Sequence, residues 1–150
     1  MIPVSLQLSG FLSYKQPVTV DFTQFDLACI SGANGAGKSS LLDAMTWALF
    51  GQARRRDDAI INSSVGSSAE VIFIFDYEGH RYRIQRGKTA NKPTLLEFTV
   101  QEADGKWRAM TEHSVRETEE RIVQTLRMDY ETFTNASFFL QGRADQFAQQ

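Results

Sequence analysis

The sequence predicts a mixed α/β fold, with a helix packed on a mixed, mainly parallel core sheet and with an added antiparallel sheet. Three patterns support it. Residues 27–31 are a short, nearly all-apolar run, as in a strand covered on both faces. Residues 41–50 carry apolar side chains at helical spacing. Residues 70–102 contain runs that alternate between apolar and polar positions, as strands of a half-buried sheet do.

The first half of the chain predicts strands before one helix. Residues 4–11 alternate loosely and residues 18–22 alternate well, so two strands are expected, with a turn near residues 15–17. A glycine-rich loop then separates the apolar strand from the helix. That helix has apolar side chains beyond a single stripe, so we expect it to be buried on much of its circumference. Gly51 is placed to close it.

The second half predicts a hairpin, a further strand and a second helix. Residues 70–77 and 81–86 suit the two hairpin strands, and residues 95–102 suit another strand. In the helix that follows Thr111, Ser114 and Glu117 have the spacing of a capping box, and Glu117 stands four residues before Arg121, as in a helical ion pair. A short strand at 136–140 is expected to lead into a loop. Nothing marks an ending at residue 150, so we expect a fragment of a longer chain.

Composition restricts the function classes. The chain is 42% hydrophobic with 11 Phe, which is typical of a folded domain. Its 16 basic and 18 acidic residues give a net charge of -2, so any contact with a polyanion needs a local patch. The single cysteine, Cys29, excludes an internal disulfide and is expected to be buried. With only His80 and His113 beside it, no Cys/His metal site is predicted.

No targeting segment is predicted. The N-terminus lacks a basic start and a long apolar stretch, and the apolar run at 41–50 is far too short to span a bilayer. The sequence therefore predicts a cytoplasmic protein that does not enter a membrane.

Residues 32–39 match the phosphate-binding pattern G-x-x-x-x-G-K-S at every fixed position, between an apolar strand and a helix. Glycines let successive backbone amides turn toward a phosphate, and the helix start adds its unpaired N–H groups. Lys38 is predicted to bridge the β- and γ-phosphates of ATP, and the Ser39 hydroxyl to bind Mg²⁺. The candidate nucleotide-binding residues are Asn34, Gly35, Ala36, Gly37, Lys38, Ser39 and Ser40.

Hydrolysis also needs a carboxylate that holds Mg²⁺. Residues 71–76 form an apolar run that ends in Asp76, which suits such a carboxylate. The same residues continue into Glu78-Gly79-His80 and a returning strand, so we favour a hairpin. The chain is therefore expected to hold ATP without the full hydrolytic machinery.

Several segments together carry a resemblance to a known family; they are residues 10–14, 20–22, 32–40, 44–51, 82–86, 126–133 and 136–147. They resemble the N-terminus of the SbcC family, ATPase subunits of bacterial DNA double-strand-end nucleases in the SMC-like branch of the ABC ATPases. The resemblance covers essentially all 150 residues. It implies that the chain is the N-terminal lobe of a P-loop ABC-type head, whose coiled coil and C-terminal lobe follow later.

The resemblance also implies site residues and partners. Gln141 matches the Q-loop glutamine, which reaches the Mg²⁺ and the attacking water; a surface loop glutamine is the alternative. Leu12 stands where some relatives carry a nucleotide-contacting arginine, which leaves that role vacant or passes it to residues 13–15. The implied partners are the C-terminal lobe of the same protein, a second head, an SbcD-type nuclease subunit and double-stranded DNA ends. The protein is then expected near the nucleoid.

Other interpretations stay open. Arg54-Arg55-Arg56, or Lys88 and Lys92, suit DNA phosphates, yet Asp57-Asp58 directly balances the arginines, and a solvated surface is the alternative. A self-contained small P-loop enzyme would need Asp76 as its magnesium carboxylate. A GTPase is excluded because residues 91–94, Asn-Lys-Pro-Thr, lack the aspartate of a guanine-binding loop. A scaffold lobe with an idle P-loop is the non-enzymatic rival.

Overall fold

The computed structural model describes residues 1–11, 16–24, 36–53, 61 and 68–135, with residues 24 and 36–40 described by their backbone alone. Its regular elements are β1 (Ile2–Ser9), β2 (Val18–Asp21), the 3-10 helix η1 (Phe22–Gln24), α2 (Ala36–Phe50), β3 (Ser68–Tyr77), β4 (His80–Thr89), β5 (Leu95–Gln101), β6 (Trp107–Ala109) and α3 (Val115–Leu126). Residues 130–135 are also helical.

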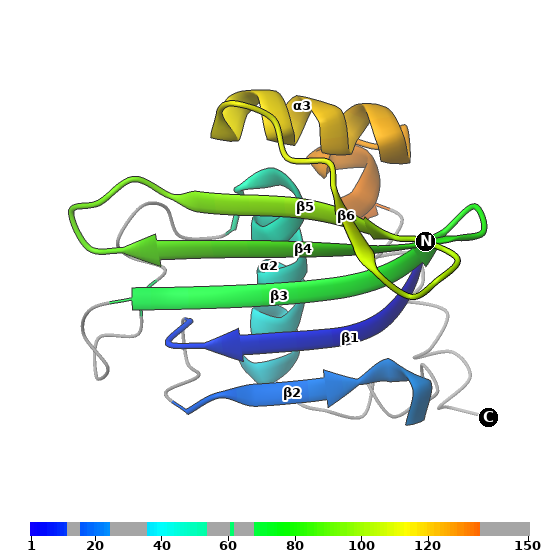
Figure 1. The fold of residues 1–150 in the computed structure, drawn as a ribbon. Helices are drawn as coiled ribbons and strands as arrows, with labels where there is room; N and C mark the ends of the chain where they lie inside the picture. Colours follow the sequence, from blue (N-terminus) through cyan, green and yellow to red (C-terminus); the bar gives the residue numbers. More distant parts are fainter. Residues whose placement is uncertain (12–15, 25–35, 54–60, 62–67, 136–150) are drawn as a thin grey trace.

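The strands form one six-stranded sheet in the order β2-β1-β3-β4-β5-β6 (Figure 1). Every neighbouring pair is antiparallel. The predicted early strand pair, the hairpin and the next strand are therefore confirmed. The expected parallel core sheet depended on the strand at 27–31, which lies outside the described residues.

Alternation along the strands gives the sheet one covered face. β1 contributes Leu6 and Leu8, and the paired positions Phe73 and Val71 on β3 are equally buried, with no exposed surface. Helix α2 crosses this face behind the strands in Figure 1, and α3 lies beside β5 and the end of α2. The opposite face carries charged side chains and partly exposed isoleucines. The hydrophobic core therefore lies between the sheet and its two helices.

Helix α2 is buried almost all round, as its sequence predicts. Four consecutive residues, from Trp47 to Phe50, are at most 7% exposed. Consecutive residues point in directions about 100° apart, so a buried run of four covers the whole circumference. Gly51, with a φ of +71°, ends the helix and donates its N–H to the carbonyl oxygen of Trp47. This left-handed closure confirms the expected end.

Helix α3 begins and ends on recognisable caps. The hydroxyl of Ser114 accepts a hydrogen bond of 3.1 Å from the N–H of Glu117, which confirms the predicted N-cap. Arg127 closes the helix in the left-handed conformation. The expected Glu117–Arg121 ion pair is wrong. Arg121 instead bonds the carboxylate of Glu112, at 2.7 Å, and the carbonyl of Met110, because both lie in the segment folded against the helix.

Candidate nucleotide-binding site

The phosphate-binding pattern ends inside helix α2. Ala36 begins the helix, so Gly37, Lys38 and Ser39 form its first turn. That turn carries no acidic residue. A first turn presents unpaired N–H groups and the positive end of the helix dipole, and therefore suits an anion such as a phosphate. The described backbone thus fits the nucleotide that the sequence implies.

Several predicted site residues fall outside what the structure describes. Residues 32–35, which include Asn34 and Gly35, and the predicted Q-loop residue Gln141 are outside it. For Lys38, Ser39 and Ser40 the backbone of α2 is described and the side chains are not. Their roles at the phosphates and at Mg²⁺ therefore stay predictions.

The start of α2 is supported by a fixed helix body. Ala44, Ala48 and Leu49 have no exposed surface, and α2 packs against β3 and β4. Packing of this density holds the helix as a rigid unit, because protein interiors are packed as densely as organic crystals. The orientation of its first turn is therefore set by the core of the domain.

The segment just beyond β1 packs against the last turn of α2. Phe11, which follows β1, is fully buried, and its ring centroid lies 5.3 Å from that of Trp47. Phe11 also forms an isolated antiparallel bridge with Ile61. Residue Leu12, where some relatives carry arginine, comes directly afterwards and lies outside the described residues. The segment expected near the nucleotide thus leaves the sheet from a point fixed against α2.

Asp76 belongs to the hairpin and is engaged by arginine. It stands opposite Arg81 in the β3–β4 register. Arg81 donates to both carboxylate oxygens, at 2.8 and 3.1 Å. This hydrogen bonding holds the pKa of Asp76 below its ordinary value, with a smaller contribution from the charge of Arg81. The favoured hairpin interpretation is confirmed, and a paired carboxylate at a hairpin end is a poor magnesium ligand.

Sequence reasoning gave no role to Arg86, which the structure buries beneath α2. Its side chain is 3% exposed and donates to the carbonyl of Ala48 at 3.3 Å and to the carboxylate of Glu119 at 2.8 Å. Burial lowers the pKa of Arg86, while the charge and hydrogen bond of Glu119 oppose that change. The signal was present in the alternation, because Arg86 shares the covered face with Tyr82 and Ile84.

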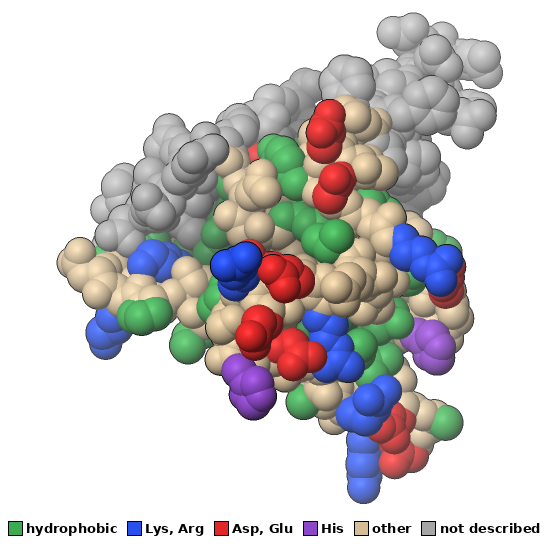
Figure 2. Space-filling view, turned by 90° about the horizontal axis from the view of Figure 1, so that it is seen from above, with side chains coloured by type: hydrophobic (Ala, Val, Ile, Leu, Met, Phe, Trp, Pro, Cys, Tyr) green, Lys and Arg blue, Asp and Glu red, His purple; other side chains and the backbone are tan. Residues whose placement is uncertain are grey.

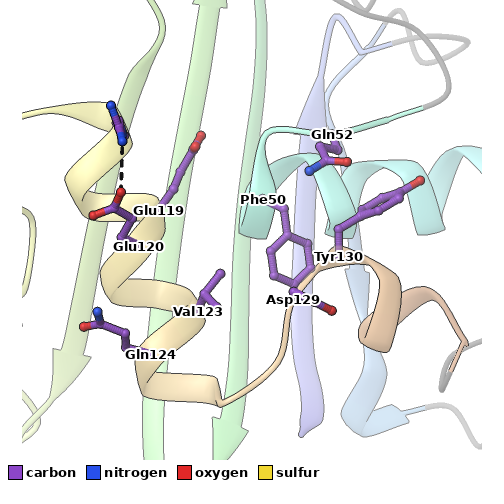
Figure 3. Close-up of a pocket in the computed structure, with 9 residues that line it drawn as sticks. Phe50, Gln52, Glu119, Glu120, Val123, Gln124, Asp129 and Tyr130 are labelled. Carbon is purple, nitrogen blue, oxygen red and sulfur yellow. Dashed lines mark hydrogen bonds and ion pairs between the residues drawn. The ribbon is translucent and has the colours of Figure 1, made fainter.

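An open groove lies at the other end of α2. It has a volume of about 370 Å³ and runs between the end of α2, the exposed side of α3 and the start of the helical residues 130–135. Figure 3 shows Val123 and Gln124 on one side, and Phe50 and Tyr130 on the other. A helix of this length separates its two ends by about 20 Å. The groove is therefore distinct from the predicted phosphate site.

The basic residues considered for DNA contact lie in two segments, 54–56 and 88–92, the latter at the β4–β5 turn. Arg54-Arg55-Arg56 lies outside the described residues. The ammonium of Lys88 donates a hydrogen bond to the backbone carbonyl of Lys92 within the β4–β5 turn. On the face seen in Figure 2, described acidic and basic side chains are interspersed.

Comparison with known proteins identifies the family. The AAA domain family matches residues 5–150. This chain belongs to that family. Among similar proteins, a subunit of the SbcCD nuclease from Deinococcus radiodurans is 33% identical over 95% of the chain. The "Probable DNA double-strand break repair Rad50 ATPase" of Aquifex aeolicus is 32% identical over 98% of the chain. The resemblance to SbcC-type ATPases is confirmed, and nucleotide binding is the property that this family implies.

The relatives are much longer than this chain. It spans 16% of the Deinococcus protein and 15% of the Aquifex protein. Among solved structures, the SMC head domain from Thermotoga maritima matches 81% of this chain and 42% of its own length, with a TM-score of 0.51 and 21% identity. That likeness confirms the predicted fold of an ABC-type head lobe. In the described part of the chain, no helix has the length and apolar character needed to cross a membrane.

Proposed function

We propose that this chain is the N-terminal lobe of an SbcC-type ATPase head, and that it binds ATP with Mg²⁺. One observation carries the proposal: the complete phosphate-binding pattern runs into the first turn of a buried helix. The names of the similar proteins, an SbcCD nuclease subunit and Rad50 ATPases, support the same interpretation. The rest of the head and a coiled coil would lie beyond the 150 residues.

Each predicted residue has a separate task. Backbone amides of residues 34–40 would surround the phosphates, and the ammonium of Lys38 would bridge the β- and γ-phosphates. Ser39 and Gln141 would hold Mg²⁺, and Gln141 would also orient the attacking water. Bound Mg²⁺ would neutralise the charge that develops on the phosphates. In this way Lys38 and Gln141 would contribute to hydrolysis, within a site that the C-terminal lobe completes.

The proposed assembly places ATP between two heads. The phosphate loop of one head would face the signature motif in the C-terminal lobe of a second copy, so binding would close the pair. Closure and hydrolysis would then control an SbcD-type nuclease subunit at double-stranded DNA ends. Such work suits a cytoplasmic protein associated with the nucleoid. An exonuclease subunit of Escherichia phage RB69, 31% identical over 78% of this chain, is consistent with a nuclease partner.

Steady-state ATP turnover tests the proposal against its rivals. The assay compares the complete protein, this chain alone and this chain with the C-terminal lobe added. We expect turnover only when both lobes are present, because the signature motif and the magnesium carboxylate would come from the second lobe.

Two outcomes would favour a rival. Substantial turnover by this chain alone, abolished by Asp76→Ala, would favour a self-contained ATPase. It would show that the Asp76 carboxylate does more than pair with Arg81. Absence of Mg·ATP binding in the presence of both lobes would leave a non-enzymatic scaffold.

A further inference from the structure

A buried arginine joins three elements at the end of the P-loop helix. Arg86 comes from β4, bonds the carbonyl of Ala48 in the last turn of α2, and pairs with Glu119 in the middle of α3. Its guanidinium carbon lies 5.8 Å from the centroid of the Trp47 ring, within the range of a cation–π contact. One side chain therefore touches two helices that are otherwise separate in sequence.

A carbon atom added at Gly51 would crowd this contact. A Cβ on Gly51 would stand 2.8 Å from a carboxylate oxygen of Glu119 and 3.0 Å from a guanidinium nitrogen of Arg86. Gly51 also has a φ that side chains rarely adopt. The end of α2 is thus shaped around the ion pair, so that α2 and α3 meet through it.

Stability alone does not explain a charged residue here. The second terminal nitrogen of Arg86 is buried and has no hydrogen-bond partner among the residues that the structure describes. A buried charge is costly, and apolar residues of similar volume usually stabilise such positions as well or better. A contribution to stability therefore does not account for Arg86. Its hydrogen bonds to two helices point instead to a role that depends on directional contacts.

The contact joins α2, whose start carries the predicted phosphate site, to α3. The far end of α2 carries Lys38 and Ser39. On the other side, α3 leads through Arg127 into the helical residues 130–135, and Gln141 follows shortly afterwards in the sequence. Phe50 links the end of α2 to residues 130–135, because its ring packs edge-on against that of Phe133, at 5.9 Å between centroids.

We propose that Arg86 is a positioning residue whose pairing with Glu119 couples the P-loop helix to α3 and to residues 130–135. ATP bound at the start of α2 would then reduce local opening of α3. Loss of the Arg86–Glu119 pair would remove this effect of ATP on α3. This inference rests on the proposed function and adds to it a connection between the P-loop helix, α3 and residues 130–135.

The test uses the complete protein and two neighbouring carboxylates. Glu119→Gln keeps the shape of the side chain and removes the charge that faces Arg86. Glu120→Gln is the matched control, because Glu120 pairs with Arg116 on the solvent side of α3, where those side chains are 57% and 88% exposed. Arg86→Met serves as a second variant. Hydrogen exchange is measured with and without Mg·ATP, together with the dissociation constant for Mg·ATP and the unfolding midpoint in urea.

We expect Mg·ATP to slow exchange in both α2 and residues 115–135 of the wild-type protein and of Glu120→Gln. In Glu119→Gln we expect Mg·ATP to slow exchange in α2 only. We also expect the affinity for Mg·ATP to fall about fivefold or more, which is the lower end of measured coupling between sites. If Arg86→Met does not fold, Glu119→Gln decides alone.

Three results separate the possibilities. Equal slowing of residues 115–135 in Glu119→Gln and Glu120→Gln, with equal affinity, would overturn the coupling, even if Glu119→Gln unfolded more easily. Slowing confined to α2 in the wild-type protein would overturn it as well, while leaving the proposed function intact. A wild-type protein that does not bind Mg·ATP would overturn both.

Discussion

The backbone carbonyl of Ser68 occupies the space into which a Cβ on Gly10 would project. Gly10 follows β1 with a φ of +63°, and Ser68 begins β3. The close approach sets how the chain leaves the sheet toward Phe11. Only glycine satisfies both the backbone conformation and the missing volume at this position.

Replacement of Gly10 is therefore expected to be severe. Gly10→Ala adds a clash with backbone to an unfavourable φ, and should lower the free energy of unfolding by more than about 2 kcal/mol. Urea unfolding followed by tryptophan fluorescence, to which the buried Trp47 contributes, measures the change.

Gly105→Ala provides the control for this prediction. Gly105 also has a positive φ, +86°, but no described atom lies within 4 Å of an added Cβ. Gly105→Ala should therefore lower the free energy of unfolding only through the unfavourable backbone conformation, by about 1 kcal/mol. Equal losses in the two variants would show that the carbonyl of Ser68 does not constrain Gly10.

The Asp76–Arg81 pair predicts a small, pH-dependent contribution to stability. Both side chains are more than one third exposed, so screening limits the pair to about 0.5 kcal/mol. The pKa of Asp76 is lowered in the folded state by its hydrogen bonds with Arg81. The contribution is therefore complete above the ordinary pKa of 3.8 and is lost as the pH falls below it.

Asp76→Asn measures that contribution. The variant should unfold slightly more easily than the wild-type protein at pH 7, and the difference should shrink as the pH falls below 3.8. Its affinity for Mg·ATP should be unchanged at pH 7. A large loss of affinity would return Asp76 to the role of a magnesium ligand.

The N-cap of α3 gives a third prediction. Ser114→Ala removes the acceptor for the N–H of Glu117 and should cost about 1 kcal/mol of unfolding free energy. Ser114→Asp keeps an acceptor at the same place and should retain most of the stability. If both variants were equally stable, the cap would contribute nothing.

The sequence was sufficient where local pattern decides structure. Alternating apolar positions predicted the β3–β4 hairpin, and the spacing of Ser114 and Glu117 predicted a helix start. Asp76 was correctly favoured as a hairpin residue, because a turn and a returning strand follow it directly.

Contacts between distant segments were beyond such reasoning. Arg121 matched a helical pair with Glu117, but the preceding segment supplies stronger partners at Glu112 and Met110. Arg86 lies on the covered face by alternation, but its burial depends on Glu119 and on the end of α2, which are distant in the sequence. The constraint on Gly10 depends on Ser68, which only the assembled sheet brings near.

Titration of the complete protein with Mg·ATP, compared with its Lys38→Ala variant, tests the central claim most directly. The ammonium of Lys38 is predicted to contact the phosphates, and loss of a charge-assisted contact of this kind should weaken binding about tenfold or more. The account predicts that loss together with an unchanged unfolding midpoint. Equal affinity in the two proteins would contradict the account.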